Sequence, residues 1–307
     1  MTLGPPESRG RLTRPAAHRT LRLAMSPNSE PREGTLSPRG FRLHYLEWGD
    51  AKAPPLVLLH GITGHARTWD TLAVALADTW HVLTLDQRGH GDSAPAPDGD
   101  YSVGAMADDL GAFADALGLS TFALLGLSMG GRVAMGFAGE HPQRVQRLVI
   151  VDIAPDIHPP GMTRIRAMIA NAPEAIESEE WAVETAMAAN PRADVAELRH
   201  RIKHALRREP DGTLTWKYAR DVREMMRRGG RREPLDLWER LTRITCPTLL
   251  VRGAESDVLS PELAQRVVAA LPDGRIVEVP EAGHTVPGDR PLEFVEVVRL
   301  FLSPGAR

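Results

Sequence analysis

Residues 126–130 read Gly-Leu-Ser-Met-Gly and lie between an apolar, strand-like run at 121–125 and a helix-like run at 132–140. A strand that passes directly into a helix forces a sharp turn, and a serine at the apex takes strained backbone angles that expose its hydroxyl. Glycines two residues before and after Ser128 relieve the crowding, because a Cβ at either place would press on a neighbouring element. The helix also directs its first N–H group, that of Met129, back towards the serine. The stretch predicts a serine nucleophile, with an inert glycine-rich turn as the alternative.

The bulk composition is that of an ordinary globular protein. The chain has 307 residues, 42% of them hydrophobic, which suffices for one large core or a core with a subdomain. The formal net charge of −3 argues against a nucleic-acid partner, because such a partner needs a basic face. The single cysteine, Cys246, excludes an intrachain disulfide and a thiolate metal cluster. We expect a small-molecule substrate, and either a monomer or a homodimer.

The hydropathy pattern predicts no membrane segment. No apolar run approaches the roughly 18 residues of a membrane span, and the N-terminus lacks the apolar core of a secretory signal. We therefore expect a cytoplasmic enzyme. Residues 1–33 are rich in Pro, Arg and Ser without periodicity, so they predict a disordered tail, within which Met25 is an alternative start to Met1.

Strand-like and helix-like segments alternate on both sides of the serine. We expect strands at 41–48, 56–60, 82–86, 121–125, 147–152, 248–252 and 275–279, and helices at 68–77, 103–117, 132–140, 261–270 and 291–301. Continuous apolar strands joined by helices indicate a parallel sheet that is covered on both faces.

The alternation is interrupted between residues 154 and 244. This stretch is charged and helix-forming, contains scattered tryptophans and offers no strand candidate. We interpret it as an inserted helical cap. The sheet domain is then discontinuous and consists of residues 34–153 and 245–307.

The serine needs two partners to become reactive. A neutral hydroxyl is a poor nucleophile, so Ser128 requires a base within hydrogen-bond reach, and that base requires an orienting acid. In a parallel sheet, functional groups converge from the carboxyl ends of the strands. His284, on the glycine-bearing loop after the last predicted strand, is our choice of general base. His60, His65 and His90 follow other strands and are competing candidates.

An oxyanion hole requires two N–H donors directed at the place where negative charge develops. Met129 supplies one of them. The loop at residues 60–64 reads His-Gly-Ile-Thr-Gly, and its glycines let the backbone bend close to the serine. We expect the N–H of Ile62 to be the second donor; a simple tight turn is the alternative for this loop.

Five segments, in this order, resemble those of α/β-hydrolases, in particular the cap-bearing esterases, lactonases and C–C hydrolases. They are residues 60–64, 86–93 (Asp-Gln-Arg-Gly-His-Gly-Asp-Ser), 126–131, 151–155 (Val-Asp-Ile-Ala-Pro) and 282–284 (Ala-Gly-His), and the resemblance covers about residues 41–302. It implies an α/β fold with a mostly parallel eight-stranded sheet, helices on both faces and an inserted helical cap. It also implies structural roles for His60 and His90.

The acid has two candidates. In the family that the chain resembles, the acid usually stands three residues after the glycine that follows the seventh strand, which here is Ser256, with Asp257 one residue later. Relatives of this kind can instead carry the acid at the end of the sixth strand, 24 residues after the nucleophile, and that position is Asp152. Either carboxylate could hold the imidazole in the required tautomer. We favour Asp152 and keep Asp257 as the alternative.

Substrate contacts are expected from the cap and from the loop after Ile62. His65 and Trp69 follow that loop, and Trp181 and Trp216 belong to the cap. Such side chains either line an acyl pocket or pack the core of the cap.

Together these residues predict a serine hydrolase that cleaves a carboxylic ester of a small or medium substrate through an acyl-enzyme, without a metal or an organic cofactor. Lactone, amide or C–C bond hydrolysis would use the same triad. The same fold would also suit a ligand-binding or receptor protein with little turnover, or cofactor-free oxygenase or perhydrolase chemistry. The serine argues against epoxide and haloalkane chemistry, for which the nucleophile would be an aspartate.

Overall fold

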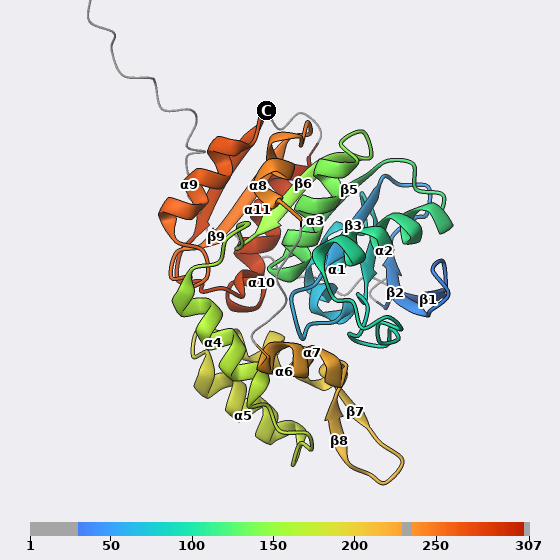
Figure 1. Ribbon diagram of the computed structural model, residues 1–307, viewed down its shortest axis with the longest axis vertical. Helices are drawn as coiled ribbons and strands as arrows, with labels where there is room; N and C mark the ends of the chain where they lie inside the picture. Colours follow the sequence, from blue (N-terminus) through green and yellow to red (C-terminus); the bar gives the residue numbers. More distant parts are fainter. Residues whose placement is uncertain (1–29, 229–234, 304–307) are drawn as a thin grey trace, which may run out of the picture.

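The computed structural model describes residues 30–228 and 235–303. Its centre is an eight-stranded sheet in the order β1-β2-β4-β3-β5-β6-β9-β10 (Figure 1). The strands are β1 (Arg32–Leu36), β2 (Leu43–Trp48), β3 (Pro55–Leu59), β4 (His81–Leu85), β5 (Phe122–Leu127), β6 (Val145–Val151), β9 (Thr248–Gly253) and β10 (Gly274–Val279). Strands β1 and β2 pair antiparallel, β2 is antiparallel to β4, and every later pairing is parallel. The predicted mostly parallel, eight-stranded sheet is confirmed.

Helices cover both faces of the sheet. They are η1 (Ala66–Trp69), α1 (Asp70–Leu76), α2 (Val103–Ala116), α3 (Met129–Glu140), α8 (Leu237–Thr242), α9 (Pro261–Ala270), α10 (Val286–Asp289) and α11 (Pro291–Leu302). The side chains of β3 show how the layers form, because Val57 and Leu59 enter the core on one face while Leu56 and Leu58 enter the core on the other. A strand buried on both faces reads as a continuous apolar run for this reason.

The cap consists of α4 (Pro159–Ala170), α5 (Glu179–Ala189), α6 (Val195–Ala205), β7 (Leu206–Arg208), β8 (Leu214–Trp216) and α7 (Arg220–Arg227), which gather on one side of the sheet domain in Figure 1. The prediction that this stretch holds no strand is wrong, since β7 and β8 form an antiparallel hairpin. Each strand has only three residues, too few for an alternating pattern to stand out in the sequence. Gly212, with φ +89°, lies in the connecting turn.

Two predicted boundaries differ from the observed packing. Helix α8 falls within the predicted cap at 154–244 but packs on α3 of the sheet domain, where a Cβ on Gly139 would lie 2.5 Å from the carbonyl oxygen of Arg240. Strand β1 begins at Arg32, inside the predicted tail at 1–33, because its polar residues carry no hydrophobic signal and its order comes from pairing with β2. Residues 1–29, and with them Met25, lie outside the described residues. Among the helices that the structure describes, none is long and apolar enough to cross a membrane.

Candidate active site

The turn between β5 and α3 is strained at its apex. Ser128 has φ 53° and ψ −114°, a conformation that side-chain-bearing residues rarely adopt. The flanking glycines are required by contact. A Cβ on Gly126 would lie 2.2 Å from the carbonyl oxygen of Gly130, and a Cβ on Gly130 would lie 2.4 Å from the carbonyl oxygen of Leu59. The backbone of β5, α3 and β3 therefore holds Ser128 at the end of its strand.

Three side chains form a continuous hydrogen-bonded chain beyond this turn. The Oγ of Ser128 lies 2.9 Å from Nε2 of His284, and Nδ1 of His284 lies 2.8 Å from Oδ2 of Asp152. They come from the end of β5, the loop after β10 and the end of β6, so the parallel strands deliver them to one edge of the sheet. The Asp152 carboxylate only accepts, so Nδ1 carries the proton. Nε2 is then the acceptor that faces the serine hydroxyl, which is the arrangement a general base needs.

Asp152 is held in place from its other side. The backbone of Asp152 has φ 49°, and its side chain is fully buried. Its Oδ1 accepts a hydrogen bond of 2.8 Å from the N–H of Gly253 on β9. Its Oδ2 accepts a second one, of 2.5 Å, from the hydroxyl of Ser256. Burial raises the pKa of the Asp152 carboxyl above its usual range, whereas the hydrogen bonds from His284, Ser256 and Gly253 act in the opposite direction. The carboxylate has one orientation, with one oxygen towards the histidine.

Asp257 does not reach the histidine. Its carboxylate binds the Arg164 guanidinium of α4, with distances of 2.6 and 2.8 Å from Nε and Nη2, and this hydrogen bond lowers the pKa of Asp257. The backbone explains the difference between neighbours, because the turn after Gly253 directs Ser256 inward to Asp152 and the next side chain outward to the cap. The alternative assignment of Asp257 as the orienting acid is therefore corrected.

The loop at residues 60–64 lies against the serine. A Cβ on Gly61 would be 3.4 Å from the Cβ of Ser128, so the segment that carries Ile62 passes beside the elbow. Met129 is the first residue of α3, so its N–H group has no partner within the helix. The two predicted donors thus come from segments that flank Ser128 on both sides.

His60 connects this loop to the loop after β4 by hydrogen bonds. Its Nδ1 donates to the carbonyl oxygen of Gly61 at 2.7 Å, and its Nε2 accepts from the N–H of Gln87 at 3.1 Å, so the imidazole is neutral. Burial lowers the pKa of His60 to about 4 and that of His90 to about 3. Both side chains are completely buried, in keeping with the structural roles that the family resemblance implied.

The four residues predicted to contact substrate have packing or hydrogen-bond partners within the protein. Trp69 is 1% exposed and stacks on Phe294 in the core beneath the sheet, so its assignment to substrate binding is corrected. Trp181 and Trp216 pack against the apolar cluster of the cap. His65 is buried, and its Nε2 donates to the carbonyl oxygen of Arg201 on α6 at 2.9 Å. The three tryptophans therefore pack in apolar clusters, and His65 links the loop at 60–64 to the cap.

Sequence reasoning missed two residues that hold the histidine loop. Asp289 is buried, and its Oδ2 accepts from the N–H of Gly283, next to His284, at 2.8 Å. Its Oδ1 accepts at 2.7 Å from the side-chain amide of Asn190, at the end of α5. The cap is thereby hydrogen-bonded to the loop that carries His284. No local pattern marks either residue, because a polar side chain at the end of a helix is usually solvated.

One cluster of the described residues has the composition of a metal site. His44, Asp86 and Asp92 offer ligand atoms within 4.8 Å of one another. These atoms already have protein partners, since Nδ1 of His44 lies 2.7 Å from Asp86, its Nε2 lies 2.7 Å from Glu33, and Lys217 lies 2.7 Å from Asp92. The cluster ties β2, the loop after β4 and the cap together.

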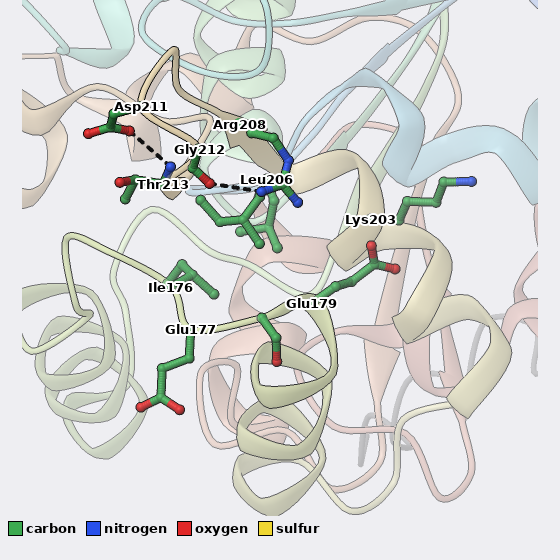
Figure 2. A pocket seen from close by; sticks show the side chains of 11 residues that line it. Ile176, Glu177, Glu179, Lys203, Leu206, Arg208, Asp211, Gly212 and Thr213 are labelled. Carbon is green, nitrogen blue, oxygen red and sulfur yellow. Dashed lines mark hydrogen bonds between the residues drawn. The ribbon is translucent and has the colours of Figure 1, made fainter.

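A hollow of about 670 Å³ opens in the cap between the start of α5 and the β7–β8 hairpin (Figure 2). Its walls mix the carboxylates of Glu177, Glu179 and Asp211 with the cations of Lys203 and Arg208. Ser128, His284 and Asp152 do not line it. We therefore centre the candidate site on Ser128.

The chain matches known proteins over most of its length. The family profile described as alpha/beta hydrolase fold matches residues 54–291. The chain is 35% identical over 270 residues to the sn-1-specific diacylglycerol lipase ABHD11 of Mus musculus, covering 83% of each protein. It is 34% identical over 256 residues to the N-formylmaleamate deformylase of Pseudomonas putida, covering 83% of this chain and 91% of that one. Among solved structures, the esterase Rv0045c of Mycobacterium tuberculosis superimposes with a TM-score of 0.70 at 27% identity, covering 88% of this chain and 90% of that one.

Proposed function

The chain belongs to the α/β-hydrolase fold family, and within that family we propose that it is a serine hydrolase that cleaves a carboxylic ester of a small or medium substrate. The observation that carries the proposal is the chain of hydrogen bonds from Ser128 through His284 to Asp152, with distances of 2.9 and 2.8 Å. A hydroxyl so placed loses its proton to the imidazole as it attacks, and the carboxylate stabilises the imidazolium that forms.

The proposed reaction has two halves. The Oγ of Ser128 attacks the ester carbonyl while Nε2 of His284 takes its proton, and the resulting oxyanion accepts hydrogen bonds from the N–H groups of Ile62 and Met129. His284 then returns the proton to the departing alcohol, which leaves an acyl-enzyme. In the second half, His284 takes a proton from water, the hydroxide attacks the acyl carbonyl, and the carboxylic acid leaves as Ser128 regains its proton.

Two of the named relatives are consistent with an ester substrate. Two of the three proteins named as relatives are a lipase and an esterase by name, and the third is a deformylase. The deformylase makes amide hydrolysis the second candidate, because Ser128 would attack an amide carbonyl with the same help from His284 and Asp152. A binding protein on this fold would have no use for a buried carboxylate aligned with a histidine and a strained serine.

A fluorophosphonate probe tests the proposal, alongside turnover of p-nitrophenyl esters with acyl chains of two to twelve carbons and of the matching anilides. We expect the wild type to be labelled and to hydrolyse esters, and Ser128→Ala to do neither. Ser178→Ala is the matched control, because Ser178 caps α5 in the cap through a hydrogen bond from the N–H of Trp181. A wild type that neither reacts with the probe nor turns over any ester or anilide would refute the proposed function.

A further inference from the structure

Ser256 has an unusual set of partners for a loop serine. Its Oγ lies 2.5 Å from Oδ2 of Asp152, and the N–H groups of Val258 and Leu259 donate to the same Oγ at 3.2 and 3.1 Å. The residue stands on the turn after β9, three positions after Gly253, whose own N–H binds the other oxygen of Asp152. Two groups from one turn therefore hold both carboxylate oxygens.

The partners determine where the hydroxyl proton lies. A serine hydroxyl has one proton to donate and two lone pairs with which to accept. The two backbone N–H groups occupy the lone pairs, so the single proton is left for Asp152, whose ionised carboxylate only accepts. The Oδ2 that receives this proton is also the oxygen that accepts from Nδ1 of His284 at 2.8 Å. The hydroxyl and the imidazole thus share one carboxylate oxygen.

We propose that Ser256 is a positioning residue for the acid of the triad, which donates its only proton to Oδ2 of Asp152 and so holds that oxygen towards His284. This inference rests on the proposed function. The hydroxyl acts in two ways. It blocks rotation of the carboxylate about its Cβ–Cγ bond, and it disperses part of the negative charge that the imidazolium meets during the reaction. The backbone N–H groups that bind Oγ keep the hydroxyl itself from rotating.

A purely structural role of Ser256 would lead to a different experimental result. If Ser256 only closed the turn through Val258 and Leu259, its loss would lower the thermal stability and leave the pH dependence of catalysis unchanged. If Ser256 positions the acid, its loss changes the chemical step, because the carboxylate is then held less firmly and carries more charge on the oxygen next to the imidazole. The two roles can be separated by measuring kcat, KM and the pH profile together.

The experiment compares Ser256→Ala with Ser256→Thr, which keeps the hydroxyl, and with Ser260→Ala as the matched control. Ser260 stands four residues later and caps α9 through the N–H of Leu263. For Ser256→Ala we expect kcat to fall about tenfold, from the usual strength of a hydrogen bond to a charged group, with KM within about twofold. The acid limb of the kcat/KM profile should move upward by about half a pH unit, because the more negative carboxylate favours the protonated imidazole. Ser256→Thr should restore both values, and Ser260→Ala should change neither.

A second readout does not depend on turnover. The proton between Nδ1 of His284 and Asp152 resonates in the far-downfield region of the proton NMR spectrum, and we expect Ser256→Ala to shift this signal while Ser260→Ala leaves it in place. If Ser256→Ala does not fold, Ser256→Cys takes its place, because the thiol is nearly the same size and a much weaker donor. An unmoved acid limb together with an unmoved downfield signal would overturn the inference. Failure of the wild type to react with the fluorophosphonate would instead count against the proposed function, and the NMR comparison would still decide the role of Ser256.

Discussion

Lowering the pH from 7.5 to 5.0 should destabilise the folded protein through His90. Its side chain is completely buried beside His60, with ring centroids 5.2 Å apart, and its Nδ1 donates to the carbonyl oxygen of Arg88. Burial, followed by the neighbouring His60, lowers the pKa of His90 from 6.5 to about 3. At pH 5.0 the folded protein therefore keeps this imidazole neutral, whereas the unfolded chain has taken up the proton.

The size of the effect follows from proton linkage. Because the folded pKa lies below the unfolded one, the unfolded state binds more protons, and stability is lost as the pH falls from about 6.5 towards about 3. A pH of 5.0 lies about 1.5 units below the pKa of the unfolded imidazole. Protonation therefore stabilises the unfolded state by about 2 kcal/mol. The folded pKa is so low that its value hardly changes this figure. At pH 7.5 the contribution is close to zero.

The assay is urea unfolding of the wild type and of His90→Gln at pH 7.5 and 5.0. The glutamine lowers the free energy of unfolding at both pH values. The test is therefore the change in that free energy between pH 7.5 and 5.0, compared between wild type and variant. We expect the wild type to lose about 2 kcal/mol more than the variant between pH 7.5 and 5.0. His141→Gln, at an exposed position at the end of α3, is the control and should lose as much as the wild type. If His90→Gln loses as much as the wild type, the reasoning about the buried neutral imidazole is refuted.

Four further substitutions test the site and its framework. Asp152→Asn should lower kcat about 10⁴-fold by favouring the wrong tautomer of the histidine, whereas Asp257→Asn should cost less than about threefold; equal losses in an ester assay would contradict the assignment of the acid. Gly130→Ala would bring a methyl group within 2.4 Å of a carbonyl oxygen at the end of β3, so we expect a loss of about 3 kcal/mol or more in urea unfolding, and an unchanged melting temperature would argue against the contact. Asp109→Asn removes the carboxylate that binds the buried Arg88 guanidinium at 2.5 and 2.7 Å, and we expect a loss of about 3–5 kcal/mol by calorimetry or urea unfolding; a loss below about 1 kcal/mol would show that other acceptors suffice.

The fold could be predicted because its signals are local. Apolar runs bounded by turns mark seven of the eight strands of the large sheet, and the glycines around Ser128 mark a turn that no other residue type could make. The edge strand β1 was missed since its residues are polar and exposed, and the hairpin β7–β8 was missed since three residues are too few for a pattern. Both depend on pairing with a partner strand, which a single segment does not reveal.

The sequence by itself determined the serine, the histidine and their places at the ends of two strands, because strand order and strand ends follow from periodicity and turn residues. Only the tertiary structure decided between Asp152 and Asp257. The two differ by which way a side chain points from a tight turn, and that depends on backbone torsions and on Arg164 and Gly253, which come from distant parts of the chain. The same holds for Trp69, whose burial under the sheet depends on packing against α11. Local patterns specify which elements form, whereas the direction of one side chain is decided by the neighbours that folding brings to it.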